Sequence, residues 1–173
     1  LFWFDLSRAG KLKNTAVTNL TVKPQGLDAS GEFSVITGEG EDDAATQSIY
    51  CYDHLGKLVS VTPCDARPGR LKFSRDGSQL IVGQRGDDTP VQVKVYENAQ
   101  GHFHVKSTSY GHDAKTHHVE LLKDGTAVSA GGSQNAIHFW NPAHSEGQAI
   151  EVIKGLGRVI RAVGINQHEQ IGI

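Results

Sequence analysis

The chain has 173 residues, of which 38% are hydrophobic, and its 17 basic and 19 acidic side chains give a formal net charge of −2. This size and composition predict a single domain with one substantial core. The near-neutral charge gives no electrostatic reason to bind nucleic acid or an anionic membrane, so neither is expected as a partner. No apolar run of about 18 residues and no basic-then-apolar leader is present, so we expect no membrane span and no signal peptide.

An aromatic residue followed by a polar one recurs along the chain at the ends of predicted strands. The four copies are Phe4-Asp5, Tyr52-Asp53, Tyr96-Glu97 and Trp140-Asn141, which lie 48, 44 and 44 residues apart. A period of this size indicates a propeller blade of four strands rather than a helical repeat.

Turn-forming segments recur in phase with these aromatic residues. They are Asp28–Gly31, Ser74–Gly77 and Lys123–Gly125, with Asn166–Glu169 as a weaker fourth copy. Glycine accepts a positive φ without a steric penalty, and Asp or Asn side chains satisfy nearby backbone groups. Each segment therefore predicts a tight connection between two strands.

Short segments between these markers are rich in Val, Ile and aromatic residues, and several alternate apolar with polar side chains. They are Phe33–Thr37, Leu80–Val82, Val91–Tyr96 and Ala136–Trp140. A period of two predicts half-buried strands. The 20 glycines interrupt nearly every window that is long enough for an amphipathic helix. We therefore predict an all-β fold, a β-propeller of four-stranded antiparallel blades.

The markers divide the chain into blades. The division gives a half-blade at 1–16, blades at about 17–62, 63–109 and 110–156, and a half-blade at 157–173. The chain thus contains about four blade-equivalents, which is at the low end of the usual range of about 4–8 blades in a propeller. We therefore expect a fragment of a larger ring, seven-bladed or similar, and self-association through the open blade edges.

The repeat that spans residues 111–141 resembles the WD-repeat β-propeller family. The resemblance rests on the pair Gly111-His112, the turn Asp124-Gly125 and the closing Trp140-Asn141, and it extends over essentially the whole chain. No repeat contains an intact Trp-Asp pair. The family resemblance implies a rigid scaffold that presents variable loops for protein–protein interaction.

The same resemblance implies a structural hydrogen-bond network inside this blade. His112, Ser129 and Trp140 resemble three of its four parts, whereas the expected aspartate is missing and Gln134 and Asn135 stand nearby.

The sequence is also similar to propellers of large bacterial multidomain proteins, some of which carry a caspase-like or other effector domain. The similar segments are Leu71–Gly77 with 86–90, and Ile153–Arg158 with 162–164. This similarity implies that any catalytic domain lies outside this chain, which would serve as a sensor or scaffold and not as an enzyme.

Propeller topology implies that the loops before each first strand share one face, called here the top face, with the loops between second and third strands. We predict that six basic residues there bind a peptide or loop of a protein partner, because guanidinium groups pair carboxylates in a two-pronged way. They are Arg67, Arg70, His117, His118, Arg158 and Arg161, with Lys115 beside them.

An acidic set is expected on the same face, which leaves a second interpretation open. It consists of Glu39, Glu41, Asp42, Asp43, Asp87 and Asp88. These charges would then solvate loops or pair with the basic residues, each exposed pair contributing about 0–1 kcal/mol.

An enzyme is the alternative prediction, because some propellers are hydrolases or lyases with a polar site in the central channel. Here that site would consist of Arg70, His117, His118 and Arg161. No G-x-S-x-G elbow, P-loop or dinucleotide fingerprint supports it.

No metal or other cofactor is expected. Neither the pair His102/His104 nor the adjacent His117 and His118 has the further ligands that zinc needs, and the acidic loops lack the alternating order of a calcium loop. Two cysteines, Cys51 and Cys64, make no disulfide framework, and reduced thiols predict a cytoplasmic protein.

Overall fold

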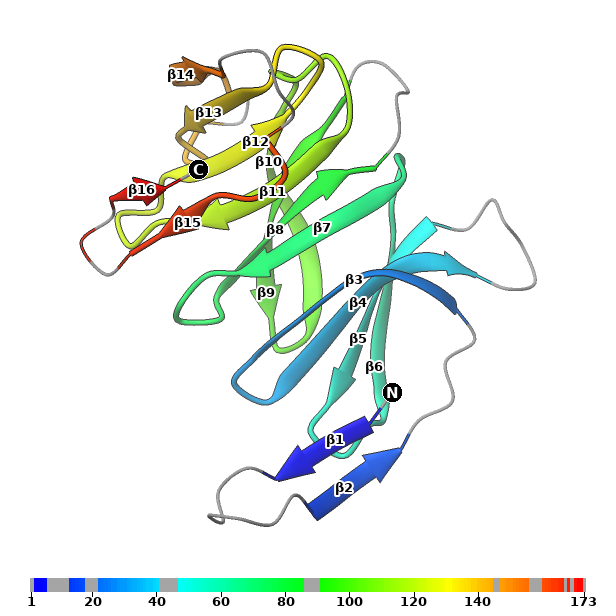
Figure 1. Cartoon of the computed structure of the whole chain (residues 1–173). Coiled ribbons are helices and arrows are strands. Elements are labelled where there is room, and N and C mark those ends of the chain that lie inside the picture. Colours follow the sequence, from blue (N-terminus) through cyan, green and yellow to red (C-terminus); the bar gives the residue numbers. More distant parts are fainter. Residues whose placement is uncertain are drawn as a thin grey trace.

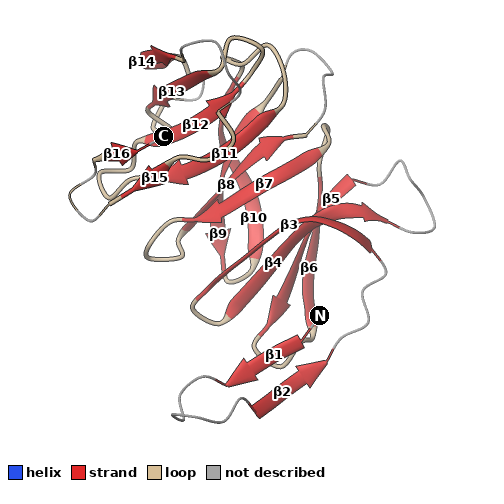
Figure 2. Cartoon of the chain, in the orientation of Figure 1, coloured by secondary structure: helices blue, strands red, loops and turns tan. Residues whose placement is uncertain are grey.

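The computed structural model describes residues 2–5, 13–17, 22–40, 47–85, 91–144, 147–155, 160–166, 168 and 170–172, the first two ranges by their backbone alone. These residues form strands and turns only (Figure 2). They contain no helix, and hence none that is long and apolar enough to cross a membrane.

Three four-stranded antiparallel sheets follow one another along the chain as blades (Figure 1). The first blade contains β3 (Val22–Ser30), β4 (Phe33–Gly40), β5 (Gln47–Asp53) and β6 (Leu58–Pro63). The second contains β7 (Pro68–Phe73), β8 (Gln79–Gln84), β9 (Val93–Ala99) and β10 (His102–Ser109). The third contains β11 (Thr116–Leu121), β12 (Ala127–Gly131), β13 (Ala136–Trp140) and β14 (Ala149–Lys154).

A two-stranded sheet stands at each end of this series. One pairs β1 (Phe2–Asp5) with β2 (Lys13–Val17), and the other pairs β15 (Gly164–Ile165) with β16 (Ile171–Gly172). The first strands of the blades lie together, β3 against β7 and β7 against β11 (Figure 1). This arrangement is a partial β-propeller, and it confirms the predicted fold class.

The hydrophobic core lies between the blades, because each sheet buries one face against the next. Val35 and Ile49 of the first blade pack with Leu71 and Leu80 of the second. The next layer contains Ile81, Val93, Val95, Val119, Leu121, Ala127 and Trp140. A third layer joins Val128, Ala130 and Ile137 to Ile160 and Val163, which precede β15. Alternating side chains on the strands supply both faces, as the period of two requires.

Two predicted elements differ from the observed ones. The turn predicted at Asp28–Gly31 begins later, because β3 continues through Ser30. Asp28 lies in the strand, where its Oδ2 accepts a hydrogen bond of 2.8 Å from the Phe73 amide of the next blade. The strand predicted from Val91 begins at Val93, because the Gln92 amide donates to the Gln84 side chain instead of to the sheet.

The backbones of the first two blades approach each other closely at Gly26. A Cβ atom there would lie 2.5 Å from the Gly69 carbonyl oxygen, which already accepts a 2.7 Å hydrogen bond from the buried Thr37 hydroxyl. We expect Gly26→Ala to lower the free energy of unfolding by about 1–3 kcal/mol, since backbone must move to admit the methyl group.

Urea unfolding measures this loss, and Gly164→Ala is the matched control. A Cβ at Gly164 meets only the Gly172 carbonyl oxygen, at 3.9 Å, so its cost is expected to stay within about 0.5 kcal/mol. Equal losses in the two variants would show that the blades do not depend on this close approach.

Candidate functional site

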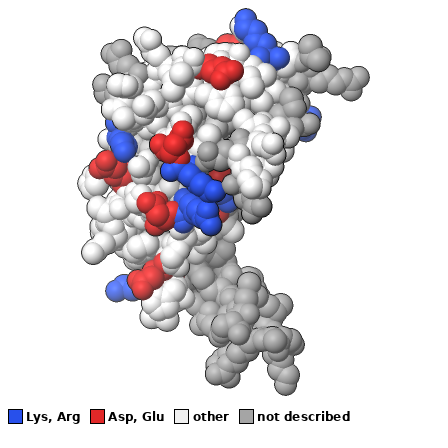
Figure 3. Space-filling view, turned by 90° about the vertical axis from the view of Figure 1, so that its left-hand side faces the viewer, with Lys and Arg blue, Asp and Glu red and all other residues white. Residues whose placement is uncertain are grey.

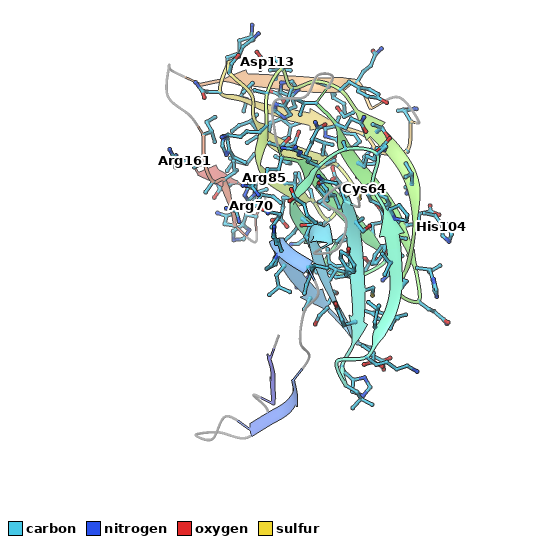
Figure 4. All side chains as sticks on the ribbon, turned by 90° about the vertical axis from the view of Figure 1, so that its right-hand side faces the viewer. Cys64, Arg70, Arg85, His104, Asp113 and Arg161 are labelled. Atoms are coloured by element: carbon cyan, nitrogen blue, oxygen red, sulfur yellow. The ribbon has the colours of Figure 1, made fainter. Side chains whose placement is uncertain are left out.

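Basic side chains from three successive repeats gather where the first strands begin. They are Arg70 on β7, Lys115 before β11, His117 and His118 on β11, and Arg161 before β15, and we call them the basic cluster. Arg70 and Arg161 lie on the same edge of the molecule, opposite the edge that carries His104 (Figure 4). Residues at equal places in the repeat thus come together because the first strands are neighbours.

The pKa of His117 indicates that the side chains of the basic cluster lie close enough for their charges to interact. Burial lowers the pKa of His117, and the neighbouring charges of Lys115, Arg161 and Arg70 lower it further. All three of these charges are positive, and no described carboxylate contributes to the pKa of His117. An imidazole in this field stays neutral near pH 7.

His118 is the next residue on β11 and is partly buried. Burial lowers its pKa first, followed by the charges of Lys72 and Arg70. Its Nε2 atom is buried and has no hydrogen-bond partner among the described residues. The positive charge of the cluster, and not this buried nitrogen, is what suits a ligand that carries a carboxylate or another anion.

Two residues of the predicted site are not placed in this cluster. Arg67 is exposed and lines a small pocket with Cys64 and Asp65 between blades. Arg158 lies outside the described residues, as do the acidic positions 41–43 and 87–88, so only Glu39 of the acidic set is described.

Arg85 is a basic residue that the sequence interpretation missed. It lies near Arg70 in the view of Figure 4, and its guanidinium donates a hydrogen bond to Gln25 of the first blade. Its position directly after β8, on the connection from second to third strand, was the available signal.

The second predicted set, His112, Ser129 and Trp140, lies inside the third blade. His112 Nε2 and Ser129 Oγ are 2.9 Å apart, and the His112 ring stacks on His138 with 4.2 Å between ring centroids. Burial lowers the pKa of His112 to about 4, and the nearby His138 adds to this shift. Trp140 Nε1 is buried and makes no hydrogen bond within the described part of the chain, so the bonded network contains two of the three residues.

Asp113 supplies a carboxylate close to this pair. Its side chain accepts hydrogen bonds from both the amide and the hydroxyl group of Ser133, which tie the Gly-His loop to the turn between β12 and β13. The sequence analysis found no aspartate for the network near Gln134 and Asn135, and it did not single out Asp113, which directly follows His112 and bonds to that turn.

The remaining candidates show no reactive arrangement. Burial raises the pKa of the Cys64 thiol to about 11, so it stays protonated at neutral pH. His102 and His104 are both exposed on β10. Within the described ranges, no group of three His, Cys, Asp or Glu side chains is arranged to hold a metal ion.

The three antiparallel four-stranded sheets and their adjacent first strands define part of a β-propeller. Comparison with solved structures finds such a likeness in a chain of the crystal structure of the Mitotic Checkpoint Complex, with a TM-score of 0.64 and 18% identity. The match covers 83% of this chain and 41% of that one, so this chain spans well under half of its length. No protein-family model and no curated protein matches the sequence.

Proposed function

We propose that this chain is a protein-recognition module whose basic cluster binds an acidic peptide or loop of a partner. The observation that carries the proposal is the field at His117, whose neighbouring charges are all cationic and come from three repeats. Arg70, Lys115 and Arg161 are exposed, and like charges held close together attract a ligand of opposite charge. A propeller suits this role, since its rigid blades hold the loops in place.

A neighbour from a multiprotein complex agrees with a protein partner in general, although the likeness concerns only the fold. The enzyme alternative uses four residues of the same cluster and stays a prediction. A cytoplasmic location, a larger parent ring and an effector domain elsewhere in a longer protein also stay predictions.

The test is a selection of random 12-residue displayed peptides on the immobilised chain. The wild-type chain is expected to enrich peptides rich in Asp and Glu. In the double variant Arg70→Glu/Arg161→Glu, the affinity of a selected peptide is expected to fall by at least about tenfold, because two attractive charges become repulsive.

The control is Lys57→Glu/Lys154→Glu, which makes the same change in net charge at two exposed lysines outside the cluster. Circular dichroism establishes that both double variants remain folded. If the control loses as much affinity as the cluster variant, binding depends on net charge alone and the proposed site is wrong.

A further inference from the structure

A second polar site lies at the other end of the first strands. A cavity of about 470 Å³ opens beside the turns that follow these strands, whereas the basic cluster lies where the strands begin. Its lining includes Asp28, Lys72, Glu120, Leu122, Ile165 and Asn166. Red and blue side chains lie next to one another near the middle of the face that carries β15 (Figure 3).

Three of these side chains occupy the same place in successive blades. Asp28, Lys72 and Glu120 pair across their sheets with Val35, Ile81 and Val128. Each of these partners belongs to the core layer on the side of the next blade. The corresponding residue of β15 is Gly164, which like Lys72 and Glu120 precedes the last residue of its strand. The series therefore reads negative, positive, negative, and then no side chain.

The following blade supplies a partner for each carboxylate oxygen of Asp28, the first residue of the series. Asp28 Oδ1 lies 3.4 Å from the Lys72 ammonium, and Asp28 Oδ2 accepts the Phe73 amide. A carboxylate at this position is thus stabilised by a cation from the equivalent position of the next repeat and by the amide that follows it.

Glu120 has neither of these partners. It is partly buried, and within the described residues its carboxylate makes no ion pair and accepts no hydrogen bond. Burial raises the pKa of Glu120, whereas the charge of Lys72 lowers it and the charge of Asp28 raises it again. The position from which a neighbouring cation would come is Gly164, where an added Cβ would meet only the Gly172 carbonyl oxygen, at 3.9 Å.

We propose that this cavity binds one lysine or arginine side chain of a protein partner, whose cationic group pairs with Glu120 in the place that Lys72 takes beside Asp28. The cavity is large enough for such a side chain, and Leu122 and Ile165 offer apolar surface for its methylene groups. Arg75 and Lys123 also line the cavity from exposed turns. They repel further cations, so the site selects a single basic residue with acidic or neutral neighbours.

This inference is independent of the function proposed for the basic cluster. The two sites lie at opposite ends of the first strands, and one is proposed to bind a negatively charged ligand and the other a positively charged one. Either proposal can therefore be wrong without the other. Reversing charge at Arg70 and Arg161 tests the first site, and neutralising Glu120 tests the second.

The experiment follows backbone amide signals of the ¹⁵N-labelled chain during titration with acetyl-Glu-Lys-Glu-amide. Saturable shifts are expected at Leu122, Ile165 and Asn166, and the analogue with norleucine in place of lysine is expected to leave them unchanged. Glu120→Gln is expected to weaken binding by roughly tenfold, because it removes the charge and keeps the shape. Acetyl-Lys-Lys-Lys-amide is expected to bind more weakly than the first peptide despite its higher positive charge.

Two variants at one position separate occupation of the cavity from damage to the fold. Gly164→Lys supplies a cation of the chain's own and is expected to abolish peptide binding, whereas Gly164→Ala is expected to retain it. Glu151→Gln, at an exposed carboxylate on β14, is the control for loss of one negative charge. Equal shifts with the lysine and norleucine peptides, or unchanged affinity in Glu120→Gln, would overturn the proposal.

Discussion

Trp140→Ala is expected to lower the free energy of unfolding by about 3–5 kcal/mol. The indole is fully buried and packs with Ile81 and Val119 in the layer between the second and third blades. Gly147 lies so close to the ring that a Cβ there would be 2.5 Å from Trp140 Cε3, so the ring is tightly packed and its removal creates a cavity. A loss of this size is a large part of the stability of an ordinary domain, about 5–15 kcal/mol.

Urea unfolding followed by far-ultraviolet circular dichroism measures the loss without relying on the fluorescence of the deleted indole. Trp140→Phe keeps part of the ring and is expected to lose less. Tyr110→Ala removes an aromatic side chain that is 56% exposed and is expected to change stability by no more than about 0.5 kcal/mol. A small effect of Trp140→Ala would mean that the layer rearranges to fill the space.

Acidification is expected to destabilise the chain through His112. Its pKa is about 4 in the folded protein, below the ordinary value of 6.5, because burial and His138 disfavour the imidazolium form. The unfolded chain therefore takes up a proton at a pH at which the folded chain does not. Stability is complete above about pH 7, falls as pH drops through 6.5 and reaches its full loss near pH 4, a total of about 3 kcal/mol from this group.

The pH dependence of urea unfolding in His112→Gln isolates this contribution. The pKa values of His117, His118 and His138 are also lowered, so the variant keeps a smaller slope of the same sign. His104→Gln, at an exposed position, is expected to keep the wild-type slope. If His112→Gln also kept it, the pKa of His112 would be the same in the folded and unfolded chains.

Sequence periodicity predicted the blades because turns and strand ends are local features. The segment Ser74–Gly77 forms a turn in which Gly77 has a φ of 73°, and the apolar run Ala136–Trp140 coincides with β13. Propeller topology also led us to expect basic residues such as Arg70, His117 and Arg161 on one face, and the charges of Arg70 and Arg161 do act on His117.

The features that the sequence did not predict depend on contacts between repeats. Asp28 resembles a turn residue in its local sequence, and only the neighbouring Phe73 amide and Lys72 explain it as a strand residue. Glu120 resembles any strand carboxylate in its local sequence, and only the structure shows that the equivalent position of the next repeat, Gly164, supplies no cation to it. A missing side chain gives no local signal, so the second site could not be found from composition or spacing.

Asp28, Lys72, Glu120 and Gly164 occupy equivalent positions in successive repeats, and this has a consequence for how the protein can evolve. The neighbouring residues on the same strands, such as Leu71 and Val119, point into the core layers and constrain the fold. The four positions themselves can change charge one repeat at a time, each by a few nucleotide substitutions. Recognition by such a propeller can therefore diverge stepwise between descendants while the packing that all of them inherit stays the same.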